Sequence, residues 1–176
     1  MGNELITSFV NMSEQKVAIG AKTIRGATKM ATVTTTNKIK SLGDEAFSGC
    51  VALTKIDVTE LTTIPAKCFE GCTSLATVTG FEAVTSFGES SFTKTAMPTI
   101  TFGKAVTEFG NMAFKGITTV TDIAIPTVTS FGTHVFDGIK TLKHADLSEN
   151  TMIPEGTFMG CSMLNNALRT QKVETV

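Results

Sequence analysis

Residues 42–58 read Leu-Gly-Asp-Glu-Ala-Phe-Ser-Gly-Cys-Val-Ala-Leu-Thr-Lys-Ile-Asp-Val, and altered copies of this stretch recur from about residue 17 to about residue 168. The copies align on a large apolar residue that returns every 22 or 23 positions. Seven residues form this column: Ile24, Phe47, Phe69, Phe92, Phe114, Phe136 and Phe158. Self-similarity at this period is typical of a solenoid, whose coils cannot bury an apolar face alone and must stack on their neighbours. We therefore predict about seven stacked coils of 22–23 residues.

Each coil is expected to contain two short strands and one turn. Runs such as 53–58 end in apolar and polar alternation, and 84–87 is rich in Thr and large apolar residues, as strands are. The segment between them, such as 43–49, is compatible with one helical or 3-10 turn closed by glycine. A second large apolar residue stands five positions before the first column, as Ile19, Leu42, Ile64, Phe87, Phe109, Phe131 and Ile153. Both columns should stack into one long core.

The glycines fall into two columns with different requirements. The first column is replaced by Pro65 and Pro154 in two coils, and proline locks φ near −65°, so this position does not need a positive φ. The second column holds glycine in every coil except one, where Lys94 stands, as expected of a left-handed turn position. The Lys94 coil is also one residue short. We therefore predict an irregular or strained coil around residues 92–98.

The pattern Ile/Leu-Gly-x-x-Ala-Phe-x-Gly-Cys-x-x-Leu-x-x-Ile resembles the leucine-rich repeat of the BspA-like type. The resemblance covers residues 17–168 and implies a leucine-rich-repeat solenoid of the α/β horseshoe class, with a parallel sheet on the concave face. Members of that family occur in surface proteins of anaerobic bacteria and in some parasitic protists. They are known chiefly as adhesins or protein-binding surfaces without catalysis, so the resemblance supplies no catalytic residue.

Both ends of the chain depart from the repeat. Residues 1–16 carry apolar residues out of register, and residues 169–176 are polar. Because an open solenoid end exposes core and strand edges, we expect 1–16 to be an N-terminal cap and 169–176 a C-terminal cap or tail on a single domain. The alternative is that one end stays uncovered and pairs, end to end or along an edge, with another copy or another protein.

Composition excludes several classes of partner. The net charge is −1, from 15 basic and 16 acidic residues, which gives no field to attract nucleic acid. No run approaches the 18 apolar residues of a membrane span, so membrane insertion is not expected. The N-terminus lacks the basic and apolar regions of a signal peptide, which predicts a cytoplasmic protein. If Met1 is not the natural start, the cell surface is the alternative location.

The four cysteines are interpreted as core residues. Cys50, Cys72 and Cys161 share one repeat column, which holds Ala or Ile in other gap-free coils, and Cys68 occupies a column of small residues. Only two histidines exist, in distant coils, so neither a metal site nor another cofactor is predicted. Cys50 and Cys72 could lie one strand spacing, about 4.8 Å, apart, which leaves a disulfide open. The absence of a leader favours free, buried thiols.

Partner binding is assigned to residues that the alternation places outward on the first strand of each coil, where Thr recurs. The candidates are Lys55, Asp57, Thr77, Thr79, Asp122, His144 and Asp146, with Phe81 added from an inserted stretch. Asp122, His144 and Ser148 contain the parts of a hydrolytic site, but a flat ladder implies neither pocket nor oxyanion donor, so no enzyme is predicted. Phe81 either is exposed in a partner contact or folds back over Phe102 or Val84.

The function predicted from the sequence is therefore a non-catalytic protein-interaction or structural scaffold module, part of an intracellular assembly, with protein partners. The alternative is a cell-surface adhesin fragment that binds host matrix or other cells. Trp and Tyr, which dominate binding hot spots, are both absent, so Phe and polar side chains must provide the contacts.

Overall fold

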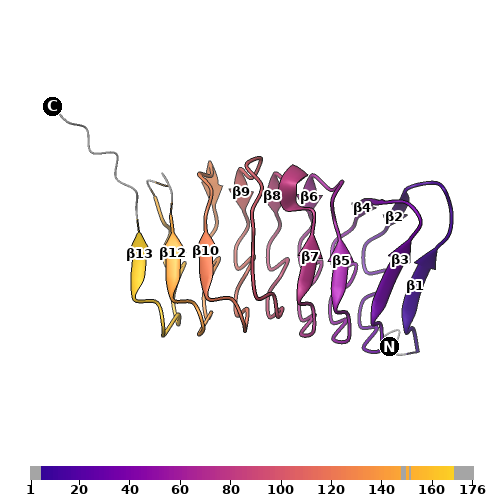
Figure 1. Ribbon diagram of the computed structural model, residues 1–176, viewed down its shortest axis with the longest axis horizontal. Helices are drawn as coiled ribbons and strands as arrows, with labels where there is room; N and C mark the ends of the chain where they lie inside the picture. Colours follow the sequence, from indigo (N-terminus) through magenta and orange to yellow (C-terminus); the bar gives the residue numbers. More distant parts are fainter. Residues whose placement is uncertain (1–4, 148–149, 151, 169–176) are drawn as a thin grey trace.

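The computed structural model describes residues 5–147, 150 and 152–168, which form a row of stacked coils (Figure 1). The coils are built from short strands joined by tight turns, and every strand pair is parallel. The strands are β1 (Ser8–Asn11), β2 (Val17–Ile19), β3 (Thr32–Thr35), β4 (Ile39–Leu42), β5 (Lys55–Asp57), β6 (Thr63–Ile64), β7 (Thr77–Thr79), β8 (Ser86–Phe87), β9 (Glu108–Phe109), β10 (Asp122–Ala124), β11 (Ser130–Phe131), β12 (His144–Asp146) and β13 (Asn166–Leu168). The predicted parallel solenoid is thus confirmed.

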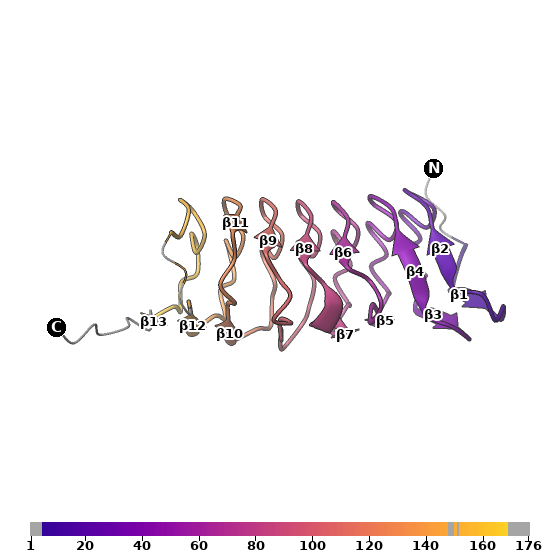
Figure 2. The same ribbon diagram turned by 90° about the horizontal axis from the view of Figure 1, so that it is seen from above.

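Two ladders run along the stack on different sides, as Figure 2 shows. The first ladder contains the pairs β1–β3 and β5–β7 and the three-stranded sheet β10–β12–β13. The second ladder contains β2–β4 and the four-stranded sheet in the order β6, β8, β9, β11. The extra residue of the second coil is absorbed as a bulge, because the register between β2 and β4 shifts between Val17 and Ala18.

The phenylalanines of the repeat form a continuous stack through the core. Phe47, Phe69, Phe92, Phe114, Phe136 and Phe158 follow one another with centroid separations of 5.1–5.9 Å and interplanar angles of 7–19°. The first five of these rings are fully buried. Each ring pair adds about 1 kcal/mol to the free energy of burial. The side-chain ladder predicted from the 22-residue period is therefore present.

The predicted helical turn in each coil is wrong. Among the described residues, the only helix is the 3-10 segment η1 (Phe81–Ala83), which lies elsewhere. In the turn at 43–49, the amide N–H groups alternate in direction. Those of Ala46 and Ser48 donate within the coil, whereas those of Glu45, Phe47 and Gly49 donate to carbonyls of the following coil at 2.7–2.9 Å. A helix would turn all of these groups inward along its own axis, so the stacking contact competes with helix formation and prevails.

Left-handed backbone occurs at two columns of this turn, and the sequence predicts only one of them. The predicted column includes Gly49 at φ 73° and Lys94 at φ 63°, which confirms strain at the coil without glycine. The other column includes Glu45 at φ 57° and holds glycine only at Gly156, so the sequence does not reveal it. The glycines of the first column have no positive φ, as predicted, and at Gly43, Gly88, Gly110 and Gly132 they permit close approach to the preceding coil instead. A Cβ at Gly43 would lie 2.3 Å from the backbone nitrogen of Ala21.

The short coil interrupts the first ladder. No strand is assigned at the described residues 98–103, so β7 and β10 are not paired through an intervening strand. The predicted irregularity at 92–98 thus begins at Lys94, and the break in the ladder lies a few residues further along the chain. Ile100 and Phe102 still face the core, where Phe102 makes edge contacts to Phe87 and Phe114.

Phe81 is not an exposed partner contact; it lies in the core with an exposed fraction of 5%. Gly80, at φ 96°, reverses the chain directly before η1 and turns the ring inward. There it packs edge-on against Phe87 and Phe92, at centroid distances of 5.1 and 5.6 Å. Phe81 therefore folds back over the core, and the rings that it contacts are those of Phe87 and Phe92.

The cysteine column is part of the core, as predicted. Cys50, Cys68 and Cys72 are fully buried, and all four cysteines are free thiols. Cys50 and Cys72 each donate from Sγ to a carbonyl of the preceding coil, those of Ile24 and Phe47. Burial raises the pKa of Cys50 to about 11 and shifts the pKa values of Cys68 and Cys72 in the same direction. These thiols are therefore protonated packing groups at neutral pH.

Replacing Lys94 by glycine should stabilise the protein by about 0.5–1 kcal/mol, because glycine adopts a positive φ without steric cost. Urea unfolding followed by circular dichroism would measure the change. Lys104→Gly is the matched control, since Lys104 is exposed and has no positive φ, and it should not stabilise. A lower unfolding midpoint for Lys94→Gly would contradict the assigned strain.

Truncating Phe81 should cost about 3 kcal/mol of stability, because Phe81→Ala empties a buried ring site between Phe87 and Phe92. The same urea titration provides the measurement. Val51→Ala, at a partly exposed apolar side chain, is the control and should change the midpoint little. A similarly small loss for Phe81→Ala would show that the ring does not belong to the core.

Candidate functional site

The outward residues of the first ladder lie where the alternation predicts. Lys55, Thr77 and Thr79 are exposed, while Asp57 is partly buried. In the pair β5–β7, Lys55 is in register with Thr77 and Asp57 with Thr79. The residues between them, Ile56 and Val78, point to the core. Four of the candidate residues therefore form one compact polar patch.

A groove of about 470 Å³ runs over this patch and continues onto β3. Its lining combines the predicted residues with Val33, Thr34, Thr35 and Ile56. β3 and β5 are not paired as strands, although the N–H of Thr54 donates weakly, at 3.4 Å, to the carbonyl of Ala31. The groove thus forms where the first ladder is split between its second and third strands. It offers hydroxyls, one cation and one carboxylate around an apolar floor.

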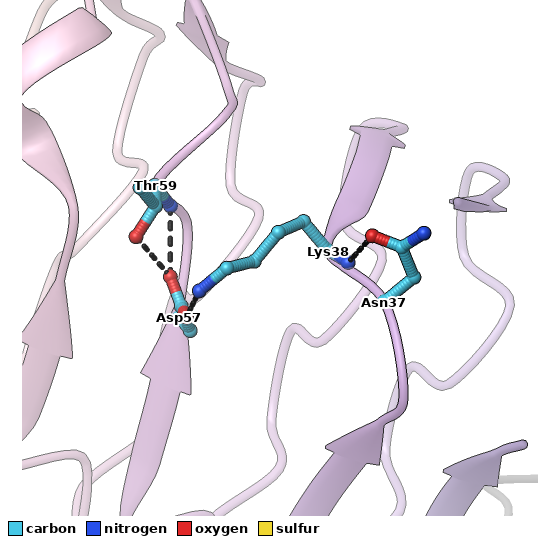
Figure 3. Close-up of polar contacts among 4 residues, drawn as sticks. All are labelled: Asn37, Lys38, Asp57 and Thr59. Carbon is cyan, nitrogen blue, oxygen red and sulfur yellow. Dashed lines mark hydrogen bonds and ion pairs between the residues drawn. The ribbon is translucent and has the colours of Figure 1, made fainter. Parts of the chain in front are cut away.

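An ion pair joins the two sides of this split (Figure 3). Lys38, in the loop between β3 and β4, extends its ammonium group to Asp57 at the end of β5. Asn37 accepts a hydrogen bond from the Lys38 backbone N–H at 2.9 Å, and its own amide donates to the carbonyl of Glu14. The loop is therefore tied to the N-terminal segment on one side and to β5 on the other.

The Asp57 carboxylate is held in its charged form. Partial burial by itself raises the pKa of Asp57, but hydrogen bonds from Lys38 and Thr59, together with the positive charge of Lys38, outweigh this effect and lower the pKa below its ordinary value. Thr59 contributes through both its backbone N–H and its hydroxyl. At neutral pH the groove therefore carries a fixed carboxylate. Because Asp57 pairs with Lys38, the ammonium group of Lys55 can contact a partner.

The remaining candidates lie on the second intact part of the ladder. Asp122 and His144 are in register on β10 and β12, and both are exposed, as the alternation predicts. The Thr121 hydroxyl donates to the Asp122 carboxylate. Asp146 stands opposite Ala124 on the same pair of strands and is exposed. Ser148 lies outside the described residues. Because the broken coil separates β7 from β10, the two groups of candidates occupy distinct parts of the face.

Lys38, which contacts the groove residue Asp57 without lining the groove itself, is not singled out by the sequence. Its position lies between the first and second strand of a coil, where the repeat has no regular column. Its role depends on reaching Asp57, 19 residues further on, and no local pattern predicts that contact. Thr34 and Thr35 belong to an ordinary Thr-rich strand, and their share in a groove follows only from the split between β3 and β5.

No cluster of three or more His, Cys, Asp or Glu side chains among the described residues is arranged to hold a metal ion. No helix in the described part of the chain has the length and apolar character needed to cross a membrane.

Asp57 should make stability pH-dependent to a small extent. Because its folded-state pKa lies below the ordinary 3.8, its contribution is present at neutral pH and is lost as the pH falls below that value. The pair is nearly half exposed, so the contribution is at most about 1 kcal/mol. Urea midpoints of wild type and Asp57→Asn should differ at pH 7 and converge in acid. Asp122→Asn is the control, and an equal pH-dependent difference for it would contradict a special role of Asp57.

Solved structures similar to this chain are leucine-rich repeat proteins of bacteria. A leucine-rich repeat protein from Bacteroides ovatus matches 93% of this chain with 24% identity and a TM-score of 0.80. The T. pallidum leucine-rich repeat protein matches 93% of the chain with 20% identity and a TM-score of 0.56. This chain spans 43% of the first structure and 71% of the second. At these identities the likeness establishes the fold alone.

No protein with a curated description matches the chain. A family model described as the BspA type leucine rich repeat region, in 6 copies, matches residues 3–121 and 85–176. The two matches together extend over nearly the whole sequence and agree with the repeat columns and the parallel coils. The chain belongs to the BspA-type leucine-rich repeat family.

Proposed function

We propose that this protein is a non-catalytic protein-binding module that uses the groove between β3 and β7 as its main contact surface. The observation that carries the proposal is the clustering of Lys55, Asp57, Thr77 and Thr79 around one hollow of about 470 Å³. The family is one of protein-interaction or surface-type modules and is generally non-catalytic. The partner is a protein; nucleic acid is not expected, because the net charge is −1.

The chemistry of the groove favours a polar, extended partner segment. Threonine hydroxyls both donate and accept hydrogen bonds, and Lys55 offers a cation that can meet a carboxylate. Val33 and Ile56 provide an apolar floor that a side chain of the partner can cover. The Lys38–Asp57 pair links the loop before β4 to β5, which helps to order this side of the groove before a partner binds.

The location inside or outside the cell separates two versions of this function. The first version is a scaffold within an intracellular assembly. The second is a cell-surface adhesin that binds host matrix or other cells, and membership of the BspA type favours it. Asp122, His144 and Asp146, on the other intact part of the ladder, are a second candidate contact in either version.

Capture of cross-linked partners from the native cell tests the proposal. Thr77→Arg places a long charged side chain in the groove and should abolish capture of the main partner, whereas Ser130→Arg, on an exposed strand of the second ladder, should not. A triple substitution Asp122→Ala, His144→Ala and Asp146→Ala tests the other patch. Undiminished capture by Thr77→Arg would refute the groove, and the identity of the captured protein decides between scaffold and adhesin.

A further inference from the structure

The second and third coils of the stack are joined less tightly than other neighbouring coils. The first ladder is split here between β3 and β5. The second ladder is split at the same level, because among the described residues β4 pairs only with β2, and β6 only with β8. Figure 1 shows that β1 and β3 are inclined to β5 and β7. In the described part of the chain, this is the one junction at which both ladders stop together.

Pro65 explains the split in the second ladder. It stands in the first glycine column, where each glycine of the later coils donates its N–H to a carbonyl of the preceding coil at 2.7–2.8 Å. A Cβ at any of these glycines would lie 2.3–2.6 Å from a backbone nitrogen of the preceding coil. The glycines are Gly43, Gly88, Gly110 and Gly132. Proline has no N–H and carries a Cβ and a ring, so Pro65 can neither form this bond nor permit this approach.

Pro154, the other proline of this column, gives a second case. It lies one coil after β11, and among the described residues β11 pairs only with β9. The second ladder therefore stops before each proline of the column, whereas it continues through the coils of Gly43, Gly88, Gly110 and Gly132. The residue in this column thus decides whether two coils pair along the second ladder.

The turn segments remain joined across the junction between the second and third coils. The N–H groups that leave the turn at 43–49 reach carbonyls of the third coil at 2.7–2.9 Å, and Phe47 stacks on Phe69 with ring centroids 5.6 Å apart. On the first-ladder side, a single main-chain hydrogen bond crosses the junction within the described chain, from Thr54 to Ala31 at 3.4 Å. The junction is therefore held firmly along the turn segments and weakly along the ladders, as a hinge is.

Two ion pairs cross this junction in the loops between the first and second strands. Lys38, before β4, contacts Asp57 at the end of β5. Lys16, directly before β2, contacts Glu60 between β5 and β6. The four side chains are 37–48% exposed, so each pair is weak and is screened by salt. These pairs can favour one arrangement of the two sides without locking it.

The groove of the proposed function spans the same junction. Residues 33–35 line it from the second coil and residues 55–57 from the third. We infer that the junction is a hinge, at which the first two coils pivot about the turn segments and the groove widens and narrows. The two ion pairs favour the narrow state. A partner in the groove would touch both sides and fix the hinge angle, a consequence that rests on the proposed function.

Pulsed electron paramagnetic resonance on the chain without a partner tests the hinge. Spin labels at Thr32→Cys and Thr99→Cys lie on exposed positions on either side of the junction. A control pair at Thr99→Cys and His144→Cys lies wholly on its C-terminal side. Cys161→Ala removes the partly exposed thiol, and the three buried thiols are shielded from the label.

The labels at Thr32→Cys and Thr99→Cys should report a short and a long distance in exchange. The double substitution Lys16→Gln and Lys38→Gln should raise the ratio of long to short by about three- to tenfold. Salt at about 1 M, where the screening length falls to about 3 Å, should act in the same direction. The control pair should not respond. A single distance that neither salt nor the double substitution shifts would overturn the hinge.

Pro65→Gly tests the cause of the hinge. Glycine restores the N–H and the space for close approach, so the distance between the labels should become single and independent of salt. Pro154→Gly, in the same column of another coil, is the matched control and should behave like the wild type. A salt-dependent distance that persists in Pro65→Gly would overturn the role of the proline. Circular dichroism checks that each variant is folded.

The hinge and the proposed binding can fail separately. The label distances are measured without any partner, so an unsuccessful capture experiment leaves the hinge standing. A junction that proves rigid removes the hinge and leaves binding in the groove to be decided by Thr77→Arg.

Discussion

In each turn segment, N–H groups that donate within the coil alternate with N–H groups that donate to the next coil. The rest of the structure depends on these hydrogen bonds between coils. At 43–49, every second N–H leaves its own coil and finds a carbonyl on the neighbour. The buried phenylalanine stack keeps those turns at a constant spacing, with rings 5.1–5.9 Å apart. No coil can satisfy its backbone or cover its ring alone, so stability belongs to pairs of neighbours, as in a one-dimensional array.

That dependence explains which parts of the fold the sequence predicts. Where a side chain packs on the equivalent side chain of the next coil, as Phe47 does on Phe69, the same residue type recurs at a fixed period and is visible in the sequence. The left-handed column at Lys22, Glu45, Lys67, Ser90, Met112, His134 and Gly156 has no recurring residue type, because its backbone is fixed by the neighbouring turn and not by the side chain. The predicted helical turn rests on local sequence alone. It is wrong because the hydrogen bonds that fix the turn run between coils.

In the candidate site, too, features set by the strand itself are predictable from the sequence and features set by contacts between coils are not. Period-2 alternation places Lys55, Thr77 and Thr79 outward, because side chains of a strand alternate whatever its neighbours do. The groove itself depends on the missing pairing between β3 and β5 and on Lys38, which crosses to Asp57. Phe81 shows the same limit, since an inserted residue has no column and its direction is set by the left-handed turn at Gly80.

The sides of this solenoid meet a partner through side chains. Each coil there has bonded its backbone to the coils before and after it, so recognition rests on residues that the strand alternation turns outward, such as those around the groove. A change at one of these side chains can alter binding without loosening the stack, because the contacts that hold the coils together lie in the turn segments and the core.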